Sequence, residues 1–276
     1  SYLYGGNGNF TVNGLDAGNY YIRIQYGGND QYNSYAVVST LTPPAFANDS
    51  EPNDVFANAN TIAENGSVTG QIGYRKNGGA YDTDDWYKLV TTKDGNIGLN
   101  IAVENGNLVY FSLYDNDGTT LFNTAYLYGG TNSFSQNGLA AGTYYVRIAH
   151  GGNGSNNSYQ LSNTVTPALY ANDAEPNNSI ATAYRLNNRP TRTGHIGYRF
   201  NGNSYETDDY YKITMYSAGN CSFTLNQENG NLVYFYLYDA AQNQVYYNYS
   251  YGGNINFNFT SLAAGDYYFR LSHGGA

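Results

Sequence analysis

The sequence predicts an all-β protein built from tandem antiparallel β-sandwich domains, and three observations support this prediction. The same text recurs at intervals of 124 residues, apolar side chains alternate with polar ones along short segments, and turn residues separate those segments. Alternation with period two is typical of strands that bury one face. With 17% aromatic and only 12% charged residues, the composition does not fit a disordered chain.

The repeat divides the chain into three parts. Residues 14–24 read GLDAGNYYIRI, residues 138–148 read GLAAGTYYVRI, and residues 262–271 carry a third version, LAAGDYYFRL, one residue short of the next period. We therefore expect the C-terminal part of one unit at 1–40, a complete unit at 41–164, and a unit without its last strand at 165–276. A repeat of this length closes its own core, so each unit is a domain. Because both ends interrupt a unit, we expect the chain to be an excerpt of a longer array.

Local patterns place strands and turns within a unit. Residues 109–114 read VYFSLY and residues 144–149 read YYVRIA, so alternate side chains should face a core. Asn-Gly at 105–106 and 137–138 and Gly-Gly at 129–130 are turn signals that should separate strands. A single helical turn fits 55–62 and its counterpart, 180–186. Because proline does not extend a central strand, we expect linkers at 42–44 and 166–167.

Two acidic segments occur together in each unit. Residues 49–54 read DSEPND and residues 82–87 read DTDDWY, and their counterparts at 173–178 and 206–211 read DAEPNN and ETDDYY. Crowded carboxylates stay ionised only where water or a hard cation takes up their charge. Calcium binds about six to eight carboxylate, amide and carbonyl oxygens, which these segments offer. The sequence therefore favours a calcium site in each unit, although solvated turns also use Asp, Asn and Pro.

The order of motifs along each unit resembles the bacterial pre-peptidase C-terminal domain family, which includes the collagen-binding domains of clostridial collagenases. The motifs are Glu-Pro-Asn, Gly-x-Ile, Asp-Asp-Trp-Tyr or Asp-Asp-Tyr-Tyr, Leu-Tyr-Asp, Ala-Gly-Thr-Tyr-Tyr-Val-Arg-Ile and Asn-Ser-Tyr. The resemblance covers the whole of each unit. It implies a jelly-roll-like β-sandwich in a secreted or surface protein, usually as a non-catalytic appendage, with calcium bound near the N-terminal linker of the domain.

Carried over position by position, the resemblance implies two sets of calcium ligands. The first set is Asp49, Glu51, Asn53, Asp54, Asp82 and Asp85, and the second is Asp173, Glu175, Asn177, Asn178, Glu206 and Asp209. Asn178 stands at the position of Asp54, and the loss of one negative ligand predicts a weaker second site. Asp84 and Asp208 either add to the ligands, cap a turn or face water.

Composition disfavours two classes of partner and a reactive thiol. A formal net charge of -9 and a pI of about 4.6 disfavour nucleic acid, whose binding needs clustered Lys and Arg. No apolar run approaches the roughly 20 residues of a membrane-spanning helix. The single cysteine, Cys221, aligns with Ile97 in a strand and is interpreted as a small buried apolar residue.

The sequence does not predict an enzyme. Catalysis needs an activated nucleophile or a positioned acid and base. His150 and His273 share a position that Tyr26 occupies in the first part of the chain, and His195 replaces Gln71, so none has the fixed surroundings that a triad demands. Glu104 and Glu228 are equivalent and could be proposed as glycosidase carboxylates, but each precedes an Asn-Gly pair, where a solvated turn is expected.

Strand alternation predicts rows of outward-facing tyrosines. Contiguous exposed aromatic rings mark binding or assembly surfaces, because tyrosine stacks on a partner while its hydroxyl stays hydrated. The same rings could instead form cross-strand ladders that stiffen the sheet. The candidates are Tyr110, Tyr114, Tyr145, Tyr234, Tyr236, Tyr238 and Tyr268.

These features support two hypotheses of different class. In the first, the chain is an extracellular structural or adhesive protein, an array of calcium-stiffened sandwiches that self-associates in a filament, sheath or cell surface. In the second, it is an accessory region of a secreted protease or other hydrolase and binds a polysaccharide or collagen-like polymer through its tyrosines. A repeat in which no unit is specialised favours the first.

Overall fold

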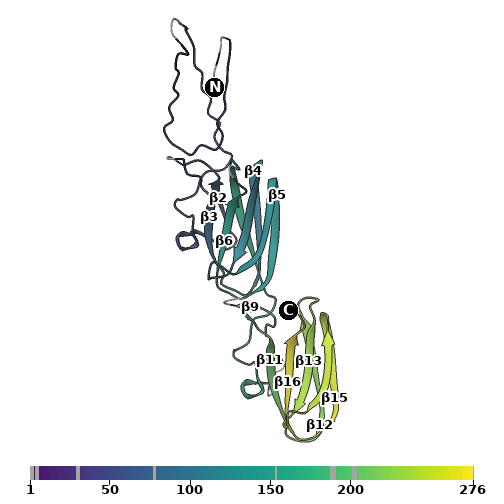
Figure 1. Ribbon diagram of the computed structural model, residues 1–276. Coiled ribbons are helices and arrows are strands. Elements are labelled where there is room, and N and C mark those ends of the chain that lie inside the picture. The colour runs from purple at the N-terminus through teal and green to yellow at the C-terminus, as the bar shows by residue number, and fades with distance from the viewer. Residues whose placement is uncertain are drawn as a thin grey trace.

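The computed structural model of the chain contains two β-sandwiches that follow one another (Figure 1). It describes residues 3, 6–28, 32–76, 79–152, 154–186, 191–200 and 204–275. Among these residues the helical structure is limited to two 3₁₀ turns, η1 (Phe56–Asn58) and η2 (Ile180–Thr182). Both fall where a helical turn was expected, after Glu-Pro-Asn. The prediction of an all-β sandwich fold is confirmed.

The first sandwich has two layers that share its two longest strands. One layer has the order β1-β3-β6-β4-β5, and in the other β7 lies between β2 and β4. The first half of β4 pairs with β7 and its second half pairs with β6, so this strand passes from one layer to the other. The strands are β1 (Asn60–Ile62), β2 (Ser67–Ile72), β3 (Asp84–Val90), β4 (Gly95–Tyr114), β5 (Leu121–Leu139), β6 (Thr143–His150) and β7 (Asn157–Pro167).

Three predicted turns of the first sandwich are wrong, because they lie within strands. Asn-Gly at 105–106 lies inside β4, where the register shifts between Val103 and Leu108, and Gly-Gly at 129–130 and Asn-Gly at 137–138 lie inside β5. Gly129 and Gly130 have φ of 87° and 73°, values that side chains disfavour. These bulges bend the long strands from one layer into the other. The predicted linker at 166–167 is also wrong, since β7 continues to Pro167, where a strand end tolerates proline.

The core of the first sandwich confirms the predicted alternation. Val109, Phe111 and Leu113 are fully buried on β4, and Phe111 stacks on Phe134 with ring centroids 5.0 Å apart. Val146 on β6 is likewise fully buried. The apolar side chains of both layers meet between them and form a single cluster.

The second sandwich repeats most of this arrangement with its own core. One layer has the order β14-β13-β16-β11-β8 and the other contains β12 and β15. Its core includes Phe235, Phe257 and Phe269, with Cys221 packed at the edge. Its strands are β8 (Tyr184–Arg185), β11 (Asp208–Met215), β12 (Gly219–Gln227), β13 (Val233–Asp239), β14 (Gln244–Ser250), β15 (Gly253–Leu262) and β16 (Gly265–His273). The short strands β9 (Arg199–Phe200) and β10 (Ser204–Tyr205) pair with each other and extend the sheet of the first sandwich from β5.

The N-terminal part of the chain forms no strand at the described residues before β1, and most of its side chains there are exposed. In the first sandwich the counterparts of this part are the end of β5, β6 and β7, which are held by β2, β3 and β4. The described residues before β1 include no counterparts of those three holding strands. Strands need a partner and a core, so the local pattern alone does not form a sheet here.

The same backbone contact joins successive parts of the chain. Leu15 pairs with Arg75, and 124 residues later Leu139 pairs with Arg199. The amide of Asp16 donates to the Arg75 carbonyl at 3.2 Å, and the amide of Ala140 donates to the Arg199 carbonyl at 2.8 Å. We call each of these contacts a joint: it connects residues 15–16 or 139–140 of one unit to Arg75 or Arg199 of the next unit.

Candidate metal centre

The first acidic cluster is assembled from the turn that precedes β1 and from the start of β3. The backbone amide of Trp86 on β3 donates to the Asn53 carbonyl at 3.0 Å, which fixes the turn against the strand. The Asn53 amide donates in turn to the Glu51 carboxylate at 3.3 Å. The Glu51–Pro52 peptide bond is cis. Segments some thirty residues apart in the sequence are therefore brought to one place.

Asp49 and Asp85 each use one carboxylate oxygen inside the protein and leave the other unpaired. Asp49 Oδ2 accepts from Asn53 Nδ2 at 2.7 Å and from the Tyr87 hydroxyl at 2.5 Å, and Asp85 Oδ2 accepts from the Tyr159 hydroxyl at 2.5 Å. The buried atoms Asp49 Oδ1, Asn53 Oδ1 and Asp85 Oδ1 have no hydrogen-bond partner among the residues that the structure describes. A buried unpaired oxygen is costly, and several converging on one point fit a hard cation.

Lysine occupies one side of the first cluster. Carboxylate oxygens of Asp49, Glu51 and Asp85 lie within 4.8 Å of one another, as do those of Glu51, Asp54 and Asp82. The Lys76 ammonium lies 3.3 Å from Glu51, 3.4 Å from Asp54 and 3.3 Å from Asp82. Glu51 therefore belongs to both groups: with Asp54 and Asp82 it contacts the lysine, and it forms the other group with Asp49 and Asp85, neither of which makes an ion pair with Lys76.

The second cluster lacks this lysine and is more compact. Asp173, Glu175, Glu206 and Asp209 bring four carboxylate oxygens within 4.8 Å of one another. Within the described part of the chain, Asp173 Oδ1, Glu206 Oε1 and Asp209 Oδ1 are buried without a hydrogen-bond partner. Phe200 stands at the position of Lys76. The second cluster therefore brings more carboxylate oxygens together than the first, although the sequence predicts it to be the weaker site.

The remaining candidate residues surround these clusters. Asn177 repeats the role of Asn53, since its side-chain amide donates to Asp173 at 2.7 Å. Asn178, with its amide oriented to satisfy its neighbours, donates to Glu175 at 3.1 Å, so it supports a carboxylate rather than adding an oxygen. Asp84 and Asp208 accept from the Nε atoms of Arg147 and Arg270, both at 2.6 Å. These ion pairs, on which the sequence was undecided, stiffen β3–β6 and β11–β16.

Burial raises the pKa of the clustered carboxyl groups. Desolvation, followed by the neighbouring Glu51, raises the pKa of Asp82 to about 8. Desolvation, with the charges of Asp173 and Glu175, raises the pKa of Asp209 to about 8. The pKa of Asp85 is also well above its usual range, chiefly through burial. Without a cation, the folded protein therefore holds protons that the unfolded chain releases.

The metal-free protein is expected to lose stability as pH rises from 5 to 8. Because the folded-state pKa values of Asp82 and Asp209 are raised to about 8, their contribution is complete below pH 4 and lost as pH approaches 8. Thermal unfolding of chelator-treated, dialysed protein measures this change, with the same series in excess calcium as the control. A melting temperature that rises with pH in the metal-free series would contradict the expectation.

Lys76→Met is expected to tighten calcium binding at the first site about tenfold, roughly 1.4 kcal/mol, because a divalent cation no longer competes with an ammonium. The same variant should melt below the parent when metal-free, since three carboxylates lose their positive neighbour. Isothermal titration calorimetry measures the affinity, and Lys93→Met provides a lysine control outside the cluster. Unchanged or weaker binding would show that the ammonium does not compete with calcium.

The predicted tyrosines fall into two environments. Tyr114 and Tyr145 are half-buried against Trp86 and Phe56, with ring centroids 5.1 and 5.6 Å apart, respectively. Tyr110 on β4 is exposed. Tyr234, Tyr236 and Tyr238 form a half-exposed row along β13, with neighbouring centroids 6.4 and 6.1 Å apart, and Tyr268 lies 5.4 Å from the Lys212 ammonium.

The adjacent strand enlarges this row in a way that the sequence analysis missed. Tyr247 on β14 is exposed and lies 5.1 Å from Tyr236 between ring centroids, and Tyr249 and Tyr251 continue the exposed row. In the first sandwich, the exposed rings of Tyr126 and Tyr128 on β5 form a similar row beside Tyr110. The period-two pattern of residues 247–251 could have revealed them, but their register against β13 could not be read from the sequence.

His195 and the two equivalent glutamates make local contacts. His195 Nδ1 lies 2.9 Å from Asp94 of the first sandwich, and its Nε2 lies 2.7 Å from the Tyr170 carbonyl. Glu104 accepts from the Ser158 hydroxyl at 2.5 Å, and Glu228 accepts from the Leu169 amide at 3.1 Å. The two glutamates therefore hold backbone or side-chain neighbours instead of lying in free turns.

No protein-family model and no curated protein matches the chain. Among solved structures it is similar to the pre-peptidase C-terminal domain of collagenase from Bacillus anthracis, at 21% identity and a TM-score of 0.33, over 42% of this chain and 100% of that one. It is also similar to tripeptidyl peptidase 2, at 10% identity and a TM-score of 0.27, over 77% of this chain and 22% of that one. A Clostridium perfringens ZmpB structure with M60 and CBM51 domains gives 8% identity, a TM-score of 0.23 and coverage of 84% and 36%.

None of the helical segments that the structure describes is long and apolar enough to cross a membrane.

Proposed function

We propose that the chain is a non-catalytic, secreted repeat protein of the pre-peptidase C-terminal type, with a structural or adhesive role in an extracellular filament, sheath or cell surface. Calcium at the two acidic clusters stiffens its sandwiches. The observation that carries this proposal is the set of buried, unpaired oxygens at the same place in each sandwich, Asp49 Oδ1 and Asp85 Oδ1 in one and Asp173 Oδ1 and Asp209 Oδ1 in the other.

The donor set favours calcium over other common metals. The clustered ligands are carboxylate and amide oxygens, without histidine or cysteine among them, which suits a hard cation. Calcium accepts about six to eight oxygens in flexible geometry, whereas magnesium demands a near-ideal octahedron and retains water. Each cluster links the acidic turn at the start of a sandwich, 49–54 or 173–178, to the beginning of β3 or β11. A bound cation would therefore hold this turn, and the linker before it, firmly against the sandwich.

The joints between parts of the chain support an extended array. The pairing of Leu15 with Arg75 recurs as that of Leu139 with Arg199. At the second joint, the contact between His195 and Asp94 adds a side-chain link between the sandwiches. A joint that repeats with the period of the sequence propagates one geometry along a chain of units.

The second candidate function is a polymer-binding accessory region of a secreted hydrolase, and the tyrosine rows favour it. Tyr236 lies beneath the Arg270 guanidinium at 5.1 Å, and Tyr247 is exposed beside it. Rings presented on a flat sheet stack on sugar rings or on the residues of a collagen-like polymer. The same surface would serve contacts between arrays.

The variant Tyr236→Ser with Tyr247→Ser is expected to abolish ordered assembly if the row packs between arrays, and polymer binding if it is a recognition surface. Electron microscopy and sedimentation in calcium measure assembly, and pull-downs on insoluble polysaccharides and collagen measure binding. Tyr216→Ser, at an exposed tyrosine outside the row, is the control. Protein that stays monomeric at high concentration in calcium, and binds none of the polymers, would refute both functions.

A further inference from the structure

One edge of each sandwich is formed by long strands. In the first sandwich β5 pairs with β4 along its length, and a further described strand, β9, meets it only at Leu139. Figure 1 shows β5 along the outer edge of this sandwich. In the second sandwich, among the described strands, β14 pairs with β13 alone and β15 with β12 alone. Such an edge presents a row of backbone amides and carbonyls to any strand that approaches it.

The opposite edge of the same layer is protected because its strand is short. In the first sandwich this edge is β1, with three residues, and in the second it is β8, with two. Very short edge strands are one of the ordinary ways in which proteins avoid pairing with other chains. Strand β5 has 19 residues, so its edge lacks this protection.

The long edges also lack the residues that usually block pairing. Residues 121–139 and 244–262 contain no charged residue and no proline, although 12% of the chain is charged. Soluble proteins commonly place lysine, another charge or proline on an exposed edge. With a net charge of -9 two copies of the chain repel each other, and an uncharged edge is a surface along which they can approach. The composition therefore favours a second copy over a partner that is recognised by charge.

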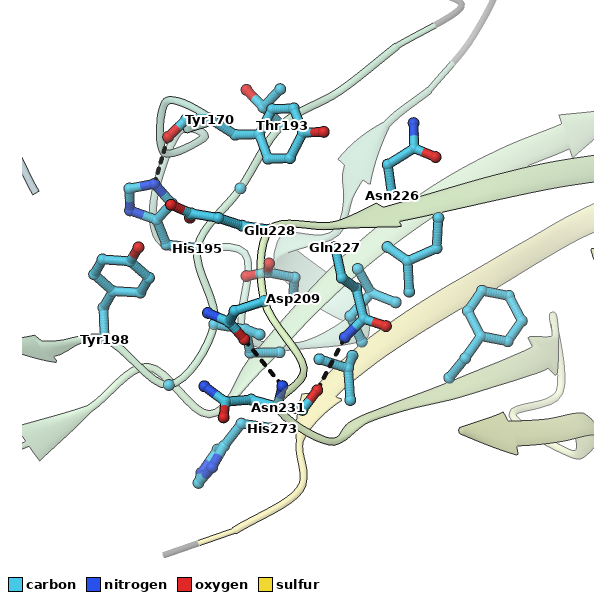
Figure 2. Close-up of a pocket in the computed structure, with 18 of the residues that line it drawn as sticks. Tyr170, Thr193, His195, Tyr198, Asp209, Asn226, Gln227, Glu228, Asn231 and His273 are labelled. Atoms are coloured by element: carbon cyan, nitrogen blue, oxygen red, sulfur yellow. Dashed lines mark hydrogen bonds between the residues drawn. The ribbon is translucent and has the colours of Figure 1, made fainter. Parts of the chain in front are cut away.

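A bulge limits the part of each edge that is straight. The glycine pairs 129–130 and 252–253 have positive φ, and they interrupt β5 and separate β14 from β15. Gln227 holds the second bulge, since it accepts from the Gly252 amide at 3.1 Å and donates to the Asn231 carbonyl at 3.1 Å (Figure 2). Because bulges twist an edge away from a partner, pairing is confined to the parts before them. We call these parts the edge segments, residues 121–128 and 244–250.

Hydrogen bonds within the edge segments show which backbone groups point outward. The Thr124 amide donates to the side chain of the preceding asparagine at 2.9 Å, and the Tyr249 amide does the same at 2.8 Å. The Tyr126 carbonyl accepts from the Asn132 side chain at 2.8 Å. Backbone groups that face a neighbouring strand bond to its backbone, so these three face away from β4 and β13. They are the groups that a partner strand would bind.

We propose that the edge segments of two copies of the chain pair as antiparallel strands, with Tyr126 opposite Tyr126 and, in the second sandwich, Tyr249 opposite Tyr249. These two tyrosines are equivalent, and each turns backbone groups outward, so each can exchange two hydrogen bonds with its copy across a two-fold axis. Their exposed rings extend the tyrosine rows across the contact. Because each chain carries two such edges, pairing continues from copy to copy and builds open assemblies.

This inference rests on the self-association named in the proposed function and specifies its partner and its contact. It requires backbone pairing at an edge, without calcium and without stacking of one tyrosine face on another. Packing between faces would involve Tyr110 and Tyr126 alike, because both are exposed and lie opposite each other on β4 and β5, with ring centroids 6.1 Å apart. Edge pairing separates them, since Tyr110 lies one strand further from the contact.

The first test is oxidative cross-linking of Tyr126→Cys, with Tyr110→Cys as the matched control, both combined with Cys221→Ser to remove the native thiol and both with chelator present. In a paired edge the two Cα atoms at position 126 lie about 5.5 Å apart, within the reach of a disulfide. Those at position 110 are separated by three strand spacings, about 14 Å, and cannot be bridged. We expect disulfide-linked dimers from Tyr126→Cys at about tenfold the yield of the control.

The second test does not depend on disulfide chemistry. Tyr126→Lys with Tyr249→Lys places like charges opposite each other at both contacts, and Tyr110→Lys with Tyr234→Lys places the same charges one strand inward. Light scattering with chelator present should show mass that grows with concentration for the parent chain and the inner-strand variant, while the edge variant stays monomeric. Circular dichroism confirms that each variant is folded. Hydrogen exchange of residues 121–128 should slow as the parent assembles, because their outward amides gain a partner.

The outcomes separate this inference from the proposed function. Equal cross-linking at positions 126 and 110, or loss of growth in both lysine variants, would assign self-association to the tyrosine faces and overturn edge pairing. A parent chain that assembles only in calcium would leave the proposed function in place and overturn edge pairing as well. A monomeric parent whose residues 121–128 become protected only when an unrelated β-forming peptide is added would assign the edge to a foreign strand, which also contradicts the proposal.

Discussion

Removing calcium is expected to lower the free energy of unfolding by about 3–4 kcal/mol, the stabilisation given by a ligand at 100 to 1,000 times its dissociation constant. For a sandwich of this size that corresponds to a fall in melting temperature of roughly 10 °C. The physical reason is that the buried, unpaired oxygens of Asp85 and Asp209 lose the cation that compensates their burial. Differential scanning calorimetry with and without chelator measures the shift.

Single substitutions can show how much of the stabilisation by calcium comes from each of the two sites. Asp85→Asn should remove the calcium response of the first sandwich, and Asp209→Asn that of the second, while Asp16→Asn at an acidic residue outside both clusters should retain both responses. Without calcium, neither variant should lower the free energy of unfolding, because each replaces a buried carboxyl group of raised pKa with a neutral amide. If chelator leaves the melting temperature of the parent protein unchanged, the protein does not depend on a bound metal for its stability.

Phe111→Ala is expected to destabilise the first sandwich by about 3–5 kcal/mol, the usual cost of deleting a buried phenyl ring. Phe111 is fully buried and stacks on Phe134 at 5.0 Å, so the cavity cannot be filled by solvent or by a surface side chain. Phe235→Ala should have a comparable effect on the second sandwich, where Phe235 stacks on Phe257 at 3.9 Å. Chemical denaturation followed by circular dichroism measures both changes.

Tyr110→Ala is the matched control for Phe111→Ala, since it removes a ring from the same strand on the exposed face. Its effect should stay near about 1 kcal/mol. Because the two cores are separate clusters, each phenylalanine variant should shift one unfolding transition and leave the other in place. A loss below that of Tyr110→Ala would show that the ring does not belong to the core.

The strands and their buried faces could be predicted because they depend on local pattern. The alternation of residues 109–114 decides which side chains face inward whatever the neighbouring strand is, and Val109, Phe111 and Leu113 are buried as expected. The acidic segments could be found for a similar reason, since their repeated pairing implies a common place. The turn signals were less informative, because a glycine with positive φ serves a bulge within a strand as well as a turn between strands.

The surroundings of the two acidic clusters could not be predicted from the candidate ligands alone. The sequence shows that Asn178 replaces Asp54 and that Phe200 replaces Lys76, but it does not show that Lys76 reaches three carboxylates of the first cluster. Asp84 and Asp208 are likewise taken by arginines on the neighbouring strand. Arg147 and Arg270 lie about sixty residues from their aspartates in the chain, and strand register brings each pair together.

By itself, the sequence determined the all-β sandwich class and the pairing of two acidic segments in each unit, because both follow from spacing along the chain. Only the tertiary structure decided which oxygens of the described residues are buried without a partner and which carboxylates are already paired. The physical reason is that pairing, burial and open edges are properties of neighbours in space, and the sheet register that sets those neighbours is a long-range outcome of folding.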